Sequence, residues 1–192
     1  MHKLIMDRIR ESICVKREVL QDNSLIDKVS SLACEMIESI KAGNKLIICG
    51  NGGSASDALH FAGEITGRFQ RERQAWPAIV LNADVATMTA IANDYGYSDI
   101  FARQAEGYTS EKDLFIGIST SGQSENIYRA VLAAKRKGAT TAALLGGNGG
   151  IIGKEVDFPL IVPSKNTARI QECHILLIHI LCELTENGLC KV

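Results

Sequence analysis

The sequence has 192 residues, of which 46% are hydrophobic and 22% are charged, as is typical of a soluble globular domain. Lys and Arg number 21 and Asp and Glu number 22, so the chain has neither the basic footprint that nucleic acid requires nor an acidic tail. This composition excludes disorder, collagen and a coiled-coil rod. We expect a single domain over residues 1–192 and no nucleic-acid partner.

The N-terminal ten residues carry charges every few positions and lack the apolar core of a signal peptide. No apolar run approaches the ~20 residues that a membrane span needs, and the longest, 175–182, contains His179. The six cysteines form no Cys-x-x-Cys pair, which favours free thiols over a zinc ribbon. We therefore expect a cytoplasmic protein that does not enter a membrane.

Two helices are predicted in the first 43 residues. Ile5, Ile9 and Ile13 share one face of the first helix, and the second carries a wide apolar stripe between Leu25 and Ile40. Residues 22–24 offer an N-cap for the second helix, and a glycine at 43 ends it. Because this stripe is wider than one sheet face requires, we expect helix–helix association within or between subunits.

From residue 44 onward, short apolar runs alternate with helical patterns. Strands are predicted at 45–49, 77–81, 113–118, 140–145 and 158–162, and helices at 55–67, 84–93, 98–107, 123–137 and 167–187. The apolar runs are continuous, which is typical of parallel strands that are covered on both faces. The sequence therefore predicts an α/β core over 44–192, a three-layer α/β/α sandwich with a five-stranded parallel sheet, and an N-terminal helical extension over 1–43.

Two of the predicted strands lead into helices through loops of small residues. The second of these loops, 119–124, places four hydroxyls in six residues. Ligands bind at this edge of a parallel sheet, and the free N–H groups of a helix N-terminus suit a phosphate. One serine would suffice as a helix cap, so four hydroxyls favour phosphate binding over the simpler interpretation.

Neither loop matches a nucleotide-binding motif. The hydroxyl loop has no lysine and is not a Walker loop, while the first loop, 50–54, lacks the G-x-G-x-x-G pattern. Taken alone, the first loop is equally consistent with a tight strand-to-helix turn. The glycine-rich run at 146–150 is interpreted as a flexible connection.

Several polar residues are candidates for chemistry. His60 and Glu64 share a helix face, although such a pair alone is usually a solvated surface pair. His179 lies in an apolar run, where it is either a core histidine or a functional one. Gln171 precedes it by eight residues, about 12 Å along a helix, so one metal held by both would either stretch the two side chains or draw on neighbouring subunits. Asn93 and its neighbour, by themselves, indicate only a helix end and a turn.

Together, certain segments resemble the phosphoheptose isomerase family of SIS (sugar isomerase) domain proteins over essentially the whole chain. They are CGNGGS at 49–54, HFAGEITGRF at 60–69, ANDYG at 92–96, GISTSG at 117–122 and ARIQE at 168–172, followed by His179. The resemblance implies a homotetramer with a helical core and sites at subunit interfaces. It also implies conversion of sedoheptulose 7-phosphate to D-glycero-D-manno-heptose 7-phosphate, the first step toward nucleotide-activated heptose for bacterial surface polysaccharide such as lipopolysaccharide.

The resemblance further implies residue roles. Glu64 would be the catalytic base and His179 the catalytic acid. Zinc would be bound by His60, Glu64, Gln171 and His179. The substrate contacts would be Asn51, Gly52, Gly53, Ser54, Asn93, Asp94, Ser119, Thr120, Ser121, Ser124 and Gln171.

These implied roles agree with enediol chemistry, in which a carboxylate moves a proton between C1 and C2 and an imidazole serves the oxygens. Zinc would orient the two oxygens and stabilise negative charge. A coordinated Glu64 is a weaker base and a coordinated His179 is not free as an acid. Either coordination loosens during turnover or zinc holds a resting form.

Two other functions compete with this one. Non-catalytic SIS proteins that bind the bacterial replication initiator resemble most of the chain but lack the counterparts of Glu64 and His179, whereas this sequence has both. SIS-type sensors bind a sugar phosphate without turnover, but they usually carry a DNA-binding segment, and residues 1–43 contain no basic recognition helix. The segment 163–167 is slightly shorter than in some relatives, which bears on substrate selectivity.

Overall fold

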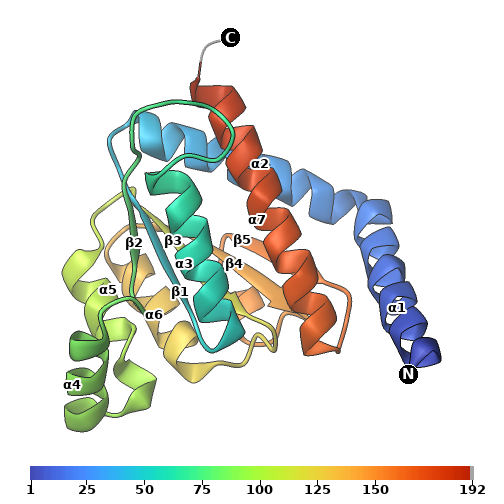
Figure 1. Cartoon of the computed structure of the whole chain (residues 1–192). Helices are drawn as coiled ribbons and strands as arrows, with labels where there is room; N and C mark the ends of the chain where they lie inside the picture. The colour runs from blue at the N-terminus through green and yellow to red at the C-terminus, as the bar shows by residue number, and fades with distance from the viewer. Residues whose placement is uncertain (191–192) are drawn as a thin grey trace.

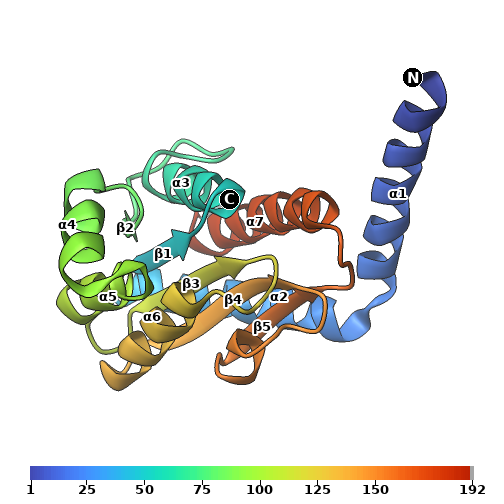
Figure 2. The same ribbon diagram turned by 90° about the horizontal axis from the view of Figure 1, so that it is seen from below.

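Two long helices open the chain in the computed structural model, which describes residues 1–190 (Figure 1). They are α1 (His2–Gln21) and α2 (Asn23–Lys41), and both are predicted by the sequence. Asp22 separates them, and its side chain accepts the N–H of Leu25 and so caps α2. Helix α1 projects away from the rest of the molecule, and only Val15 and Val19 near its end are buried (Figures 1 and 2).

All five predicted strands are present and form one parallel sheet. The strands are β1 (Leu46–Gly50), β2 (Ala78–Val80), β3 (Leu114–Ser119), β4 (Thr140–Gly146) and β5 (Phe158–Val162), in the order β2-β1-β3-β4-β5. Gly50 pairs with Ile118, and Ile118 pairs with Leu144. The loops that follow β1, β3 and β4 therefore leave the sheet side by side.

Helices cover both faces of the sheet (Figure 2). Helices α2, α3 (Gly53–Thr66) and α7 (Thr167–Leu189) pack on one face, and α4 (Val85–Tyr95), α5 (Ala102–Tyr108) and α6 (Glu125–Arg136) pack on the other. Ile48 and Ile116 are buried in the first core, whereas Ile47 and Phe115 are buried in the second. Apolar side chains are thus required at every strand position, and the predicted three-layer α/β/α sandwich is confirmed.

The structure differs from the sequence prediction in one helix. The helix expected at 98–107 is divided into a 3-10 turn, η1 (Tyr97–Asp99), and α5. Between them, Ile100 and Phe101 are completely buried in the core beneath α6. The chain turns to insert these two side chains, which one continuous surface helix would not achieve.

The glycine-rich run at 146–150 is not a flexible connection. Its backbone lies directly against the hydroxyl loop, because a Cβ at Gly122 would overlap the carbonyl of Gly149 and a Cβ at Gly150 would overlap the carbonyl of Gly122. Gly122, Gly149 and Gly150 also have positive φ angles. The glycines therefore permit two loops to pack backbone to backbone, and η2 (Ile152–Lys154) follows them.

None of the helices within residues 1–190 combines the length and the apolar character that crossing a membrane requires.

Candidate active site

Three polar side chains meet between α3 and α7, which lie side by side on one face of the sheet (Figure 1). His60 and Glu64 are one turn apart on α3, and the His60 Nε2 atom lies 3.1 Å from Glu64 Oε1. The same Nε2 atom lies 3.1 Å from Nε2 of His179, which α7 supplies from 119 residues further along the chain. The predicted pair on α3 and the distant histidine therefore form one cluster.

His179 is a half-buried member of this cluster and not a core histidine. Its ring stacks on Phe69, with centroids 5.6 Å apart, and its other neighbour is the ring of His60. The core histidine of α7 is His174, which is completely buried and whose Nε2 lies 3.0 Å from the carbonyl oxygen of Leu145. Burial lowers the pKa of His174 to about 4, although the contact with Leu145 opposes the shift.

The cluster fits a metal ion by both chemistry and spacing. Two imidazole nitrogens and one carboxylate oxygen all lie within 4.8 Å of one another. Zinc binds such donors at about 2.0–2.2 Å in tetrahedral geometry, which separates neighbouring ligand atoms by roughly 3.3 Å. The Nε2 atom of His60 carries at most one hydrogen, so it cannot donate to Glu64 and to His179 at the same time. The residues present therefore suit zinc with one position left for a further ligand.

The hydroxyl loop joins β3 to α6 and is ordered by its own hydrogen bonds. Ser119 Oγ lies 2.9 Å from Ser124 Oγ and accepts the N–H of Gly122, while Ser121 Oγ accepts the N–H of Gln123. Ser124 is the N-cap residue of α6, but its side chain does not cap the helix. The first turn of α6 therefore retains N–H groups that can donate to an anion.

A cavity of about 700 Å³ opens beside the hydroxyl loop at the carboxyl edge of the sheet. It is lined by Thr120 and Ser121 from this loop, by the loop after β4, and by the segment that leads from β5 into α7. The complete lining is Thr120, Ser121, Gly146, Gly147, Asn148, Pro163, Ser164, Lys165, Thr167 and Ile170. The lining offers four hydroxyl groups and the ammonium of Lys165, which are groups that can bind the phosphate and hydroxyls of a phosphorylated polyol.

The comparisons with known proteins agree with this geometry. The model of the SIS domain family matches residues 14–146. The phosphoheptose isomerase of Sulfurimonas denitrificans is 45% identical over 97% of this chain and 96% of its own length, and that of Trichlorobacter lovleyi is 48% identical over 98% and 95%. The chain belongs to the phosphoheptose isomerase family. Its members are enzymes.

A solved structure of a phosphoheptose isomerase from Francisella tularensis superposes on this fold with a TM-score of 0.91 at 40% identity, covering 95% of this chain and 96% of the other. The phosphoheptose isomerase of Neisseria gonorrhoeae gives the same TM-score at 38% identity over 96% and 98%. Nearly the whole chain therefore has the architecture of these two phosphoheptose isomerases.

Within this member of the phosphoheptose isomerase family, Gln171 lies away from the histidine cluster. Its amide packs against the start of α3, where a Cβ at Gly53 would overlap Gln171 Nε2. Gly53 precedes His60 by seven residues, about 10 Å along a helix axis. One copy of the chain therefore brings together three of the four residues expected to bind zinc and holds the fourth at the other end of α3.

The first loop, 50–54, is tied to the hydroxyl loop's helix. The amides of Asn51 and Asn126 donate to each other at 3.0 and 2.9 Å, and the Tyr97 hydroxyl also donates to Asn51. Gly52 has a φ of +55°, and Ser54 is buried. The loop is therefore a rigid turn whose exposed backbone faces the same sheet edge as the cavity.

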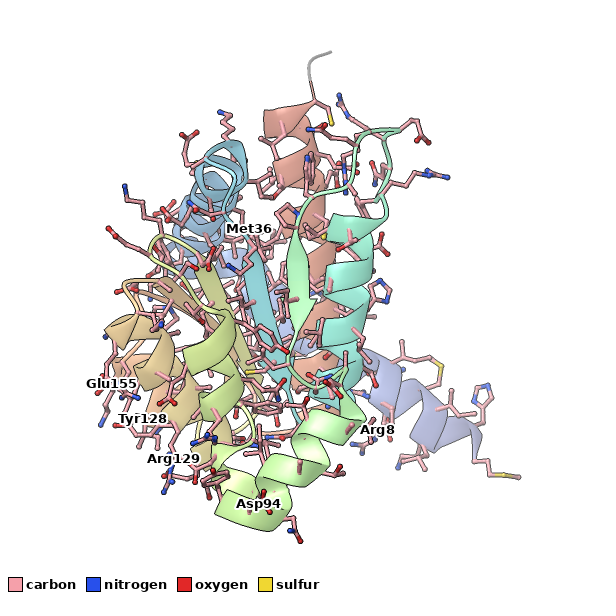
Figure 3. The ribbon with its side chains drawn as sticks, turned by 90° about the vertical axis from the view of Figure 1, so that its left-hand side faces the viewer. Arg8, Met36, Asp94, Tyr128, Arg129 and Glu155 are labelled. Atoms are coloured by element: carbon pink, nitrogen blue, oxygen red, sulfur yellow. The ribbon has the colours of Figure 1, made fainter. Side chains whose placement is uncertain are left out.

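Asn93 and Asp94 are exposed on the last turn of α4, where Asn93 Nδ2 donates to Asp94 Oδ1. Figure 3 shows Asp94 on α4 at the outer edge of the molecule. Both residues are available to a ligand or to another subunit, and no contact joins them to the cluster within the described residues.

Sequence reasoning missed several residues of this site. Asn126, Phe69 and Lys165 contact or line it without having been singled out. Phe69 lies in the HFAGEITGRF segment, but its role depends on the fold of the following loop. Lys165 could have been found, since it is a cation in the loop after the last predicted strand.

Proposed function

We propose that this chain converts sedoheptulose 7-phosphate to D-glycero-D-manno-heptose 7-phosphate in the cytoplasm, as the first step toward nucleotide-activated heptose for bacterial surface polysaccharide. The observation that carries the proposal is the meeting of Glu64 with His60 and His179, all within 4.8 Å. The near full-length phosphoheptose isomerases at 45% and 48% identity support the choice of substrate.

The cavity beside the hydroxyl loop is the proposed site of the phosphate. Its hydroxyls and the free N–H groups of α6 donate to the phosphate oxygens, with Ser119 and Ser124 holding the loop in place. Lys165 is the one charged side chain among the described residues that line this cavity, and it supplies the positive charge that the loop itself lacks. The backbone of Gly52 and Gly53 and the amides of Asn51 and Gln171 then face the sugar.

Glu64 and His179 share the proton transfers in this proposal. Glu64 removes a proton from C1 of the ketose while His179 donates a proton to O2, which gives the enediol. Glu64 then returns a proton to C2 while His179 accepts the proton of O1, which gives the aldose. Zinc held by His60, Glu64 and His179 would, when bound, orient O1 and O2 and stabilise their negative charge, and the proton transfers would require Glu64 and His179 to be released from it.

A homotetramer belongs to the same proposal. Six large apolar side chains on α1 are exposed, as are three on α7 that recur every fourth residue: Leu4, Ile5, Met6, Ile9, Ile13 and Leu20, and Leu176, Ile180 and Leu184. Two such stripes on one chain are typical of helices that pack against other subunits. A neighbouring subunit would also supply the Asn93–Asp94 pair to a shared site.

Substitution of the two catalytic candidates tests the function. Glu64→Gln and His179→Ala should each lower isomerase activity on sedoheptulose 7-phosphate by about 10²–10⁴-fold, because each removes one partner of a proton transfer. Glu72→Gln is the matched control, since that side chain is 92% exposed in the loop after α3. Its activity should stay at the wild-type level.

Full activity in Glu64→Gln or His179→Ala would contradict the proton-transfer role proposed for that residue. A folded wild-type protein with no isomerase activity, but with affinity for a replication initiator, would support the non-catalytic alternative instead.

A further inference from the structure

Glu186 is a buried carboxylate on α7 that the proposed reaction does not use. It follows His179 by seven residues and therefore lies on the same face of the helix. Its side chain is 2% exposed, and it accepts hydrogen bonds from three consecutive backbone N–H groups, those of residues 69, 70 and 71, at 2.8–2.9 Å. A fourth bond comes from Arg73 Nε at 3.0 Å. Helix α7 is thus fastened to the loop that follows α3.

Arg73 fastens the same loop to the end of α3. Its guanidinium donates to the carbonyl oxygens of Glu64 and Ile65, two of the groups that a helix C-terminus leaves unpaired. It also donates to Gln74 O at 3.0 Å and stacks 3.6 Å above the ring of Trp76, which is buried. With 4% of its side chain exposed, Arg73 is as buried as its partner Glu186.

The Arg73–Glu186 pair therefore connects the two helices that bear the cluster. One residue of the pair bonds to the last turns of α3, which carries His60 and Glu64, and the other is part of α7, which carries His179. The backbone that Glu186 holds begins at Phe69, the residue whose ring stacks on the imidazole of His179. The pair thus contacts both helices as well as the backbone that carries the Phe69 ring.

We infer that Glu186 and Arg73 are positioning residues, which hold α3, α7 and Phe69 so that the donor atoms of His60, Glu64 and His179 converge on one metal ion. The metal-binding part of this inference rests on the proposed function, whereas the part that concerns the packing of α3, α7 and Phe69 does not. A purely stabilising role would be expected of any buried ion pair; in this pair both partners also bond to the backbone next to the cluster.

The test compares two buried carboxylates in the full-length protein. Glu186→Gln replaces one carboxylate oxygen of Glu186 with an NH₂ group, which then faces the N–H groups that the oxygen accepted. The matched control is Asp113→Asn in the loop before β3, whose side-chain hydrogen bonds reach neither α3 nor α7. Asp113 is also 2% exposed and accepts from the Lys45 ammonium and from the backbone N–H groups of Lys45 and Ser110. Both changes should lower the melting temperature of the protein.

Zinc affinity separates the two variants. Titration of the metal-free proteins with zinc, against a competing chelator, should show about a 10–100-fold weaker affinity for Glu186→Gln than for the wild type, because loosened supporting contacts misplace the ligands. Asp113→Asn should retain the wild-type affinity. Phe69→Leu should give an intermediate loss while leaving the loop's hydrogen bonds intact. Equal zinc affinity in wild type and Glu186→Gln would overturn the inference.

A second readout keeps the inference apart from the proposed reaction. The nuclear Overhauser effect between the Phe69 ring and the His179 imidazole should be present in the wild type and Asp113→Asn and lost in Glu186→Gln. A wild-type protein that bound no zinc would contradict the proposed metal site. Separately, a Phe69–His179 contact that persisted in Glu186→Gln would overturn the positioning role. Loss of the contact in Glu186→Gln, without zinc binding in the wild type, would support a role of Glu186 in positioning His179 but not in forming a metal site.

Discussion

His174 is a neutral imidazole in the core between α7 and β4. Its Nδ1 atom is buried without a hydrogen-bond partner, so protonation would leave a buried N–H and a buried charge. Burial is the main cause of its depressed pKa of about 4, compared with 6.5 when unfolded. Between pH 6.5 and pH 4 the unfolded chain binds a proton at His174 that the folded protein does not bind, so the free energy of unfolding falls as the pH falls.

The first prediction concerns this pH window. The wild type should lose about 3 kcal/mol of unfolding free energy between pH 6.5 and pH 4 through His174, from a shift of this size in pKa. His174→Gln should be less stable at pH 7 but should lack this part of the pH dependence, as measured by urea unfolding at several pH values. His2→Gln, at an exposed position, is the control. An unchanged pH slope in His174→Gln would show that another group is responsible.

Helix α3 contains two glycines whose surroundings differ. A Cβ at Gly53 would overlap the Gln171 amide, whereas a Cβ at Gly63 would meet nothing within 4 Å. Gly53→Ala should therefore displace Gln171 and lower kcat/KM for the sugar phosphate at least tenfold, on the order of 1.4 kcal/mol. Gly63→Ala should instead stabilise the helix by about 0.5–1 kcal/mol with unchanged kinetics.

Steady-state kinetics and thermal unfolding of the two alanine variants check this prediction together. Normal kinetics in Gly53→Ala would mean that the position of Gln171 does not matter for catalysis.

The strands were predictable because a parallel strand that is covered on both faces is buried along its whole length, as β1 and β3 are, and therefore appears as a continuous run of mostly apolar residues. The division of the helix expected at 98–107 was not predictable, since it depends on the burial of Ile100 and Phe101 beneath another helix. The glycine run at 146–150 was misinterpreted for a similar reason. Its glycines permit close contact with the backbone of the hydroxyl loop, and a contact between distant segments leaves no pattern in the local sequence.

The candidate site was predictable only in part. The i,i+4 spacing brings His60 and Glu64 together on any helix, but it does not say what they face. The approach of His179 depends on how α3 packs against α7, and its significance came from the family resemblance. The contribution of Glu186 depends on a loop with no regular pattern, in which three N–H groups converge on one carboxylate.

At the scale of the whole molecule, helix α1 stands out because it lies apart from the α/β body (Figure 2). Ile9 is 53% exposed in the middle of its apolar stripe, and a face of this kind is stable in water when another subunit covers it. Ile9→Glu would place a charge in that contact. We expect the variant to remain folded, because the core does not involve this position, but to form smaller assemblies than the wild type.

Light scattering coupled to gel filtration measures this outcome. Glu18→Lys changes a charge on the opposite face of the same helix, because nine residues make about two and a half turns, and it should leave the mass unchanged. A wild-type mass of one chain would contradict the homotetramer directly.

Helix α7 lies wholly outside the 14–146 segment that matches the general SIS domain, yet it supplies Gln171, His179 and Glu186. The segment that matches the SIS domain model thus contains none of these three residues, nor strand β5. Under the proposed function, a change confined to α7 would remove the catalytic acid while leaving the hydroxyl loop between β3 and α6 unaltered.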